Sequence, residues 1–133
     1  MRKKILVTFI FAIFSIILNA QKNGRIEKLD VKAFDTKLIH LKGNLIDVRS
    51  PQEFKEGAIE GAKNMDWESK EFKKEIQNIP TNQPVFLYCG GGFRSNEAAE
   101  WMIKNDFSTV IVLENGYDAW KEVHKSANSQ EKN

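Results

Sequence analysis

The chain has 133 residues, a length typical of one domain. Its 20 basic and 18 acidic residues nearly balance, so nothing in its charge favours binding to nucleic acid. Because Cys89 is the only cysteine, an internal disulfide bond is excluded.

The first 20 residues have the three-part pattern of a secretory signal peptide. Residues 2–4 are basic, residues 5–18 are apolar apart from two hydroxyl residues, and Ala20 is a small residue suited to cleavage. The apolar part is shorter than the roughly 20 residues that a membrane-spanning helix needs. We therefore expect cleavage near Ala20 and a periplasmic or secreted protein that does not contact the membrane. The alternative is that residues 1–20 stay attached as an anchor. Cleavage would leave 17 basic and 18 acidic residues.

The spacing of apolar, capping and turn residues predicts the elements in the first half of the mature chain. In order they are an extended polar segment (21–29), a helix (31–41) capped by Asp30, a buried strand (45–48), a helix whose capping box joins Ser50 to Glu53, a loop with two glycines (57–65), and a helix that Asp66 caps and Trp67 opens.

The second half predicts two more strands, each followed by a helix. These are a strand over 85–89, a helix over 95–104, a strand over 109–113 and a helix over 117–125. Strands that alternate with helices predict an α/β fold of three layers, with a central, mostly parallel sheet covered by helices on both faces. In such folds ligands bind at the carboxyl ends of the strands, where Cys89 is expected to lie.

Three glycines follow Cys89 before the next helix, and the segment reads Cys-Gly-Gly-Gly-Phe-Arg-Ser over 89–95. Glycine backbones adopt positive φ freely, so their N–H groups are able to turn inward as a cradle for negative charge. The start of the next helix and the guanidinium of Arg94 add positive charge to the same space. These groups favour a thiolate, the nucleophilic form of cysteine. The competing interpretation is a buried structural cysteine followed by a plain turn.

Four motifs in order resemble the single-domain rhodaneses, a family of sulfurtransferases. They are Leu-Ile-Asp-Val-Arg with Glu-Phe (45–49, 53–54), Gly-Ala-Ile-Glu-Gly-Ala-Lys-Asn (57–64), Cys89 with Arg94 and Ser95, and Asn-Gly-Tyr-Asp-Ala-Trp (115–120). The resemblance implies a rhodanese-like fold over residues 26–124. The polar composition of residues 125–133 predicts a flexible C-terminal tail.

The resemblance also implies a reaction in two steps. Cys89 would take a sulfane sulfur from thiosulfate, polysulfide or a persulfide and carry it as a persulfide to a thiol or protein acceptor. The substrate-binding residues would be those of the loop, and no cofactor or metal is expected. In order they are Gly90, Gly91, Gly92, Phe93, Arg94 and Ser95.

Two other functions stay open. A cysteine phosphatase or arsenate reductase uses a similar cradle, but its loop is one residue longer than the four residues between Cys89 and Arg94. The second alternative is a rhodanese-like module that binds a partner without catalysis. The family often has a basic residue where this chain has Gly90, so we expect the dianion thiosulfate to be a poor donor.

Three residues are expected to support the site rather than react. Arg49 is predicted to pair with Glu53 across the corner between strand and helix. Asp47 is predicted to accept hydrogen bonds from backbone amides near the active loop. Trp67 is expected beside the entrance, and neither His40 nor His124 is assigned a role.

Overall fold

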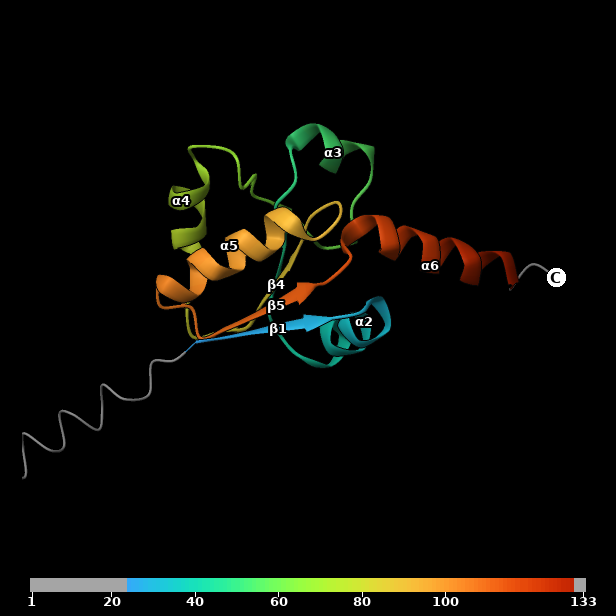
Figure 1. The fold of residues 1–133 in the computed structure, drawn as a ribbon, viewed down its shortest axis with the longest axis horizontal. Helices are drawn as coiled ribbons and strands as arrows, with labels where there is room; N and C mark the ends of the chain where they lie inside the picture. The colour runs from blue at the N-terminus through green and yellow to red at the C-terminus, as the bar shows by residue number, and fades with distance from the viewer. Residues whose placement is uncertain (1–23, 131–133) are drawn as a thin grey trace, which may run out of the picture.

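The computed structural model describes residues 24–130 (Figure 1). The predicted signal peptide, residues 1–20, lies outside them. The strands are β1 (Arg25–Leu29), β2 (Asn44–Asp47), β3 (Lys63–Asn64), β4 (Val85–Tyr88) and β5 (Thr109–Leu113). The helices are α2 (Val31–His40), α3 (Pro51–Glu56), α4 (Phe72–Glu75), the 3₁₀ helix η1 (Ile76–Asn78), α5 (Phe93–Lys104) and α6 (Gly116–Gln130). In this part of the chain, no helix has both the length and the apolar character that a bilayer crossing requires.

The five strands form one parallel sheet in the order β1-β5-β4-β2-β3. This confirms the predicted α/β fold, and the three predicted strands lie within one residue of their expected ends. Two strands were not predicted. Residues 25–29 were expected only to be extended, but they pair along β5 from Arg25 opposite Thr109 to Leu29 opposite Leu113.

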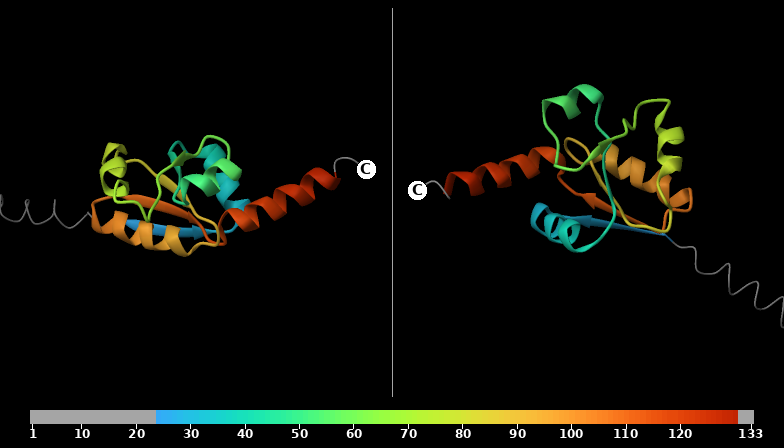
Figure 2. Two further views of the ribbon diagram at one scale, coloured as in Figure 1. Left: turned by 90° about the horizontal axis from the view of Figure 1, so that it is seen from above. Right: turned by 180° about the vertical axis from the view of Figure 1, so that it is seen from behind.

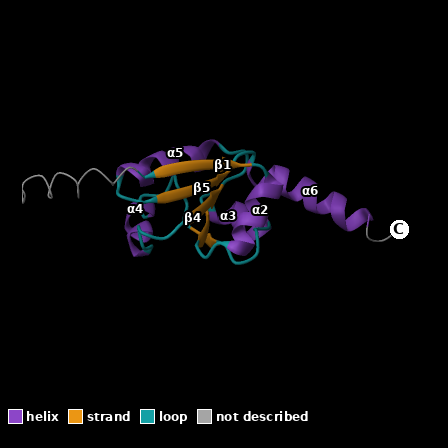
Figure 3. Ribbon diagram, turned by 90° about the horizontal axis from the view of Figure 1, so that it is seen from below, coloured by secondary structure: helices purple, strands orange, loops and turns teal. Residues whose placement is uncertain are grey.

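Helices cover both faces of the sheet, as Figures 2 and 3 show. Side chains alternate along each strand, so β4 sends Val85 and Leu87 to one face and Phe86 and Tyr88 to the other. The first face packs against α4, η1 and α5, and the second packs against α2 and α6. Cys89 follows this alternation and lies on the face covered by α5.

The predicted helix start at Asp66 is wrong. The Asp66 Oδ1 accepts the amide of Glu68 at 2.9 Å, which closes a local turn instead of a helical one. The helix α4 begins only at Phe72, so Trp67 lies in the connecting segment.

The last helix is longer than predicted. The prediction ended it at Lys125, whereas α6 continues to Gln130 and extends beyond the sheet (Figures 1 and 2). Residues 126–130 are therefore helical, and the flexibility of the tail over 125–133 stays a prediction.

Candidate functional site

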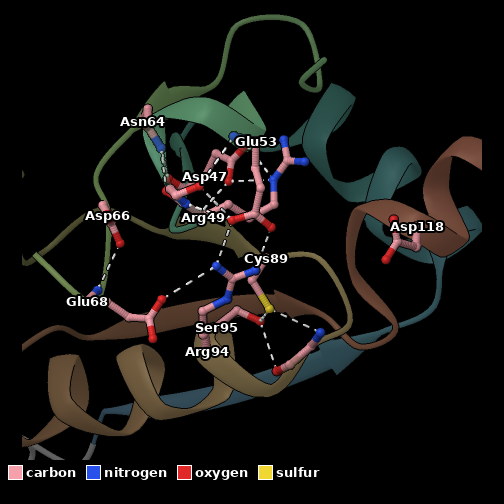
Figure 4. Close-up of polar contacts among 12 residues, drawn as sticks. Asp47, Arg49, Glu53, Asn64, Asp66, Glu68, Cys89, Arg94, Ser95 and Asp118 are labelled. Carbon is pink, nitrogen blue, oxygen red and sulfur yellow. Dashed lines mark hydrogen bonds and ion pairs between the residues drawn. The ribbon is translucent and has the colours of Figure 1, made fainter. Parts of the chain in front are cut away.

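Cys89 lies directly after β4, at the carboxyl edge of the sheet, as the sequence predicts (Figure 4). Its side chain is buried, with 1% of the residue exposed. The glycine loop, residues 90–92, leads from it into α5, which begins at Phe93, two residues earlier than predicted. Of the predicted loop residues, Gly92 and Ser95 contact the sulfur atom of Cys89.

The amide of Gly92 donates a hydrogen bond to Cys89 Sγ at 3.1 Å. This amide turns inward because Gly92 has a φ of 104°, a left-handed conformation that favours glycine. The loop also packs tightly there, since a Cβ on Gly92 would lie 2.1 Å from the carbonyl oxygen of Glu114. Both observations require glycine at this position.

Ser95 is the second group beside the sulfur. Its buried hydroxyl lies 3.4 Å from Cys89 Sγ and donates to the carbonyl of Gly92 at 3.0 Å. A hydroxyl has a single hydrogen, so in this arrangement Ser95 Oγ faces the sulfur as an acceptor for a thiol hydrogen. A rotation of the hydroxyl would let it donate to a thiolate instead.

The first turn of α6 binds the other side of the loop. The amide of Tyr117 donates to the carbonyl of Cys89 at 2.7 Å, and the amide of Asp118 donates to the carbonyl of Gly90 at 3.1 Å. Gly116 makes this approach possible, because a Cβ there would lie 2.3 Å from the carbonyl oxygen of Gly90. The sequence predicts a strand ending at residue 113 and a helix from residue 117, but not these contacts.

Arg94 forms a two-pronged ion pair with Glu53, at 2.9 Å and 2.8 Å. The predicted pair between Arg49 and Glu53 is therefore wrong. Hydrogen bonds from Arg94 hold the pKa of Glu53 at about 2, against a usual 4.5, so this carboxylate is charged at neutral pH. The same hydrogen bonds raise the pKa of Arg94. Arg94 thus supplies the loop with a charge that Glu53 already balances.

Arg49 pairs instead with Asp47, two residues earlier. Its Nη2 lies 2.6 Å from Asp47 Oδ2, and both side chains are almost fully buried. The same nitrogen donates to the carbonyl of Gly57, and the guanidinium stacks 4.2 Å from the centre of the Tyr117 ring. Asp47 Oδ1 accepts the backbone amide of Arg49 at 2.9 Å, so Asp47 does bind a backbone amide, as predicted, and that amide belongs to the end of its own strand.

The remaining predicted residues lie around this centre. Gly91 is open to solvent, and Gly90 faces Arg94, since a Cβ there would lie 3.4 Å from Arg94 Nη2. Phe93 is 75% exposed at the end of the loop. Trp67 packs edge-on against Phe72 and donates to Glu97 at 3.3 Å.

Neither His40 nor His124 has a described contact with Cys89 or the glycine loop; both bind other residues. His40 contacts the carbonyl of Thr36, and His124 stacks on Trp120 and lies 3.2 Å from an oxygen of Asp35.

A hollow of about 580 Å³ between β1 and α2 shares no lining residue with the glycine loop. Within residues 24–130 we find no group of three or more metal-binding side chains.

Known proteins match this chain over most of its described length. Residues 30–123 match the rhodanese-like domain family. The uncharacterized protein YqhL of Bacillus subtilis is 39% identical over 59% of this chain, and the match spans 61% of that protein, less than two thirds of its length. The thiosulfate sulfurtransferase GlpE of Pseudomonas putida is 30% identical over 65% of this chain and 76% of its own length. The crystal structure of a rhodanese-related protein from Thermoplasma volcanium superimposes with a TM-score of 0.64 at 23% identity, over 73% of this chain and 92% of that one.

Proposed function

The chain belongs to the rhodanese-like domain family, and on that premise we propose that it is a sulfurtransferase in which Cys89 carries the sulfur as a persulfide. The observation that supports this most directly is the hydrogen bond from the Gly92 amide to Cys89 Sγ at 3.1 Å. A fixed N–H aimed at a sulfur stabilises the negative charge that a thiolate or persulfide carries.

In the first step the Cys89 thiolate attacks the outer sulfur of a donor such as thiosulfate. The new bond joins Cys89 Sγ to that sulfur, the sulfur–sulfur bond of the donor breaks, and sulfite leaves with its electron pair. The amide of Gly92 and a rotated Ser95 hydroxyl are the groups beside the sulfur that would stabilise the charge.

In the second step an acceptor thiolate attacks the outer sulfur of the Cys89 persulfide. The sulfur–sulfur bond to Cys89 breaks, and Cys89 leaves as a thiolate ready for another cycle. Neither step requires an oxidant or a reductant from outside the pair of substrates.

The length of the loop favours sulfur over phosphate. Four residues separate Cys89 from Arg94, and Gly92 closes the loop directly onto Cys89 Sγ. A single sulfur atom suits so short a loop better than a tetrahedral oxyanion does. Arg94, the cation that a phosphatase would use on its substrate, is bound at both ends of its guanidinium by Glu53.

Mass spectrometry of the purified protein tests the proposal. After exposure to polysulfide, we expect a gain of about 32 Da, one sulfur, on the peptide that contains Cys89, and no gain in Cys89→Ser. Release of the added sulfur to a thiol acceptor would complete the cycle. If no donor, including thiosulfate, adds sulfur to Cys89, the protein is a binding module instead. Hydrolysis of an aryl phosphate would indicate the phosphatase.

A further inference from the structure

A patch of aromatic and acidic side chains borders the glycine loop on the side of α5. We call it the rim and define it as Trp67, Glu68, Phe93 and Glu97. Phe93 is 75% exposed although it directly follows Gly92, and the Glu68 side chain is 70% exposed. The proposed sulfur transfer does not use any of these four side chains.

A hydrogen bond, an aromatic contact and an ion pair fix the side chains of the rim. Trp67 donates from Nε1 to Glu97 Oε2 at 3.3 Å, and its ring packs against Phe72 with the ring centres 5.0 Å apart. Glu97 lies one turn after Phe93 on α5, so the two side chains share one face of the helix. Glu68 Oε2 lies 3.8 Å from Arg94 Nη1, which places it beside the active loop (Figure 4).

The charge of the rim is negative. Glu68 and Glu97 belong to it, and Asp66, whose carboxylate accepts the amide of Glu68, lies next to it. The cation in contact with Glu68 is Arg94, whose charge is already balanced by Glu53. On the other side of the loop, Asp118 pairs with Lys121 at 3.3 Å, so that side is closer to neutral.

An exposed aromatic ring beside two exposed carboxylates fits a partner that offers both aliphatic and cationic groups. Lysine and arginine side chains combine the two, because an apolar stem leads to a charged end. Charge complementarity of this kind steers association and selects partners. A small anionic acceptor would instead meet repulsion at the rim.

We propose that the rim docks a protein segment in which the sulfur-accepting cysteine is flanked by lysine or arginine. The inference rests on the proposed sulfurtransferase activity and identifies its acceptor. Basic neighbours would also favour the thiolate of that cysteine, which is the form that attacks the Cys89 persulfide. The transferred sulfur then forms a persulfide on the segment, and Cys89 returns as a thiolate.

The test uses three acceptors with the sulfur-loaded protein. Two peptides of equal length hold one cysteine each, flanked by lysines in one and by glutamates in the other, and the third acceptor is 2-mercaptoethanol. We expect the lysine peptide to remove the sulfur at least about 10-fold faster than the glutamate peptide at low salt, with the difference shrinking at high salt.

Charge-reversal variants test whether the preference for the lysine peptide arises at the rim. Glu68→Lys/Glu97→Lys should abolish or invert the preference, while Glu60→Lys/Glu122→Lys, the same charge change on exposed acids outside the rim, should retain it. Phe93→Ala should slow transfer to both peptides a few-fold more than it slows transfer to 2-mercaptoethanol, because only the peptides are large enough to cover the exposed ring. Equal rates for the two peptides, or a preference that survives charge reversal at the rim, would overturn the inference. Loading of sulfur onto Cys89 is measured first, so a failure of the proposed activity itself is seen separately.

Discussion

Arg94 and Glu53 are 41 residues apart in the sequence, yet their side chains meet through two parallel hydrogen bonds of 2.9 Å and 2.8 Å. The pair joins α3 to the first turn of α5, directly beside the glycine loop. Glu53 also closes the capping box of α3 through Ser50. The same carboxylate therefore caps one helix and holds Arg94, the second residue after the glycine loop.

The stability of the protein should depend on Glu53 at acidic pH. Its pKa in the folded protein, about 2, is below the usual 4.5, so its contribution is present above about pH 4.5 and is lost as the pH falls toward 2. Because the Glu53 side chain is 35% exposed, solvent screening limits the pair to about 1 kcal/mol. Urea unfolding at several pH values should show this decline in the native chain and a smaller one in Glu53→Gln. An exposed control, Glu56→Gln, should keep the native pH dependence.

Gly116→Ala should damage both the fold and the loop. The new Cβ would lie 2.3 Å from the carbonyl oxygen of Gly90, and the φ of 66° is itself unfavourable for alanine. We expect a loss of at least about 2 kcal/mol in the free energy of unfolding and a large loss of sulfur loading on Cys89. Gly91→Ala is the matched control, because a Cβ at Gly91 meets no atom within 4 Å. Equal behaviour of the two variants would contradict this account of the contact between loop and helix.

Asp47→Ala should be strongly destabilising because it leaves the Arg49 guanidinium buried without its carboxylate. Removing one partner of a buried ion pair costs about 3–5 kcal/mol. The double variant Asp47→Ala/Arg49→Met should lose less than Asp47→Ala alone, since no buried charge is left unpaired. Chemical denaturation of the native chain, Asp47→Ala, Arg49→Met and the double variant measures the coupling, and additive losses would show that the two residues act independently.

Ser95→Ala should slow the chemistry more than it changes the fold. The carbonyl of Gly92 keeps two other donors, the amide and the side chain of Asn96, when the Ser95 hydroxyl is removed. The sulfur, in contrast, loses a neighbouring hydroxyl at 3.4 Å. We expect roughly 10-fold slower sulfur loading, equal to about 1.4 kcal/mol of barrier, with a small change in unfolding free energy. Unchanged loading kinetics would mean that Ser95 only packs against the loop.

Periodicity and capping residues were sufficient to predict the central part of the fold. The buried strands β2, β4 and β5 are each built around a short apolar run, and the capping box at Ser50 has its predicted geometry. The edge strand β1 was not predicted as a strand because its sequence is largely polar. It becomes a strand by pairing with β5, a residue-to-residue contact that its own sequence does not reveal. The helix after Asp66 was wrong because a side chain bound a backbone amide locally.

The sequence predicted which residues gather at the site better than it predicted their partners. Cys89, the glycines and Ser95 are adjacent in the chain, so their proximity follows from a strand end and a helix start. Arg49 and Glu53 are also close in sequence, but each found another partner, Asp47 and Arg94. The pairing of Glu53 with Arg94 depends on the distance between α3 and α5, which the folded sheet sets, whereas Asp47 is only two residues from Arg49.

The amides of Tyr117 and Asp118, in the first turn of α6, bind the carbonyl oxygens of Cys89 and Gly90 and so influence the charge around Cys89 Sγ without contacting it. Their hydrogen bonds hold the oxygens of Cys89 and Gly90, the negative ends of two peptide dipoles, toward Tyr117 and Asp118. The loop is thereby polarised, with carbonyls facing α6 and the Gly92 N–H facing the sulfur. The helix α6, which begins 27 residues after Cys89, thus fixes the direction of two peptide dipoles in the segment that contains the sulfur.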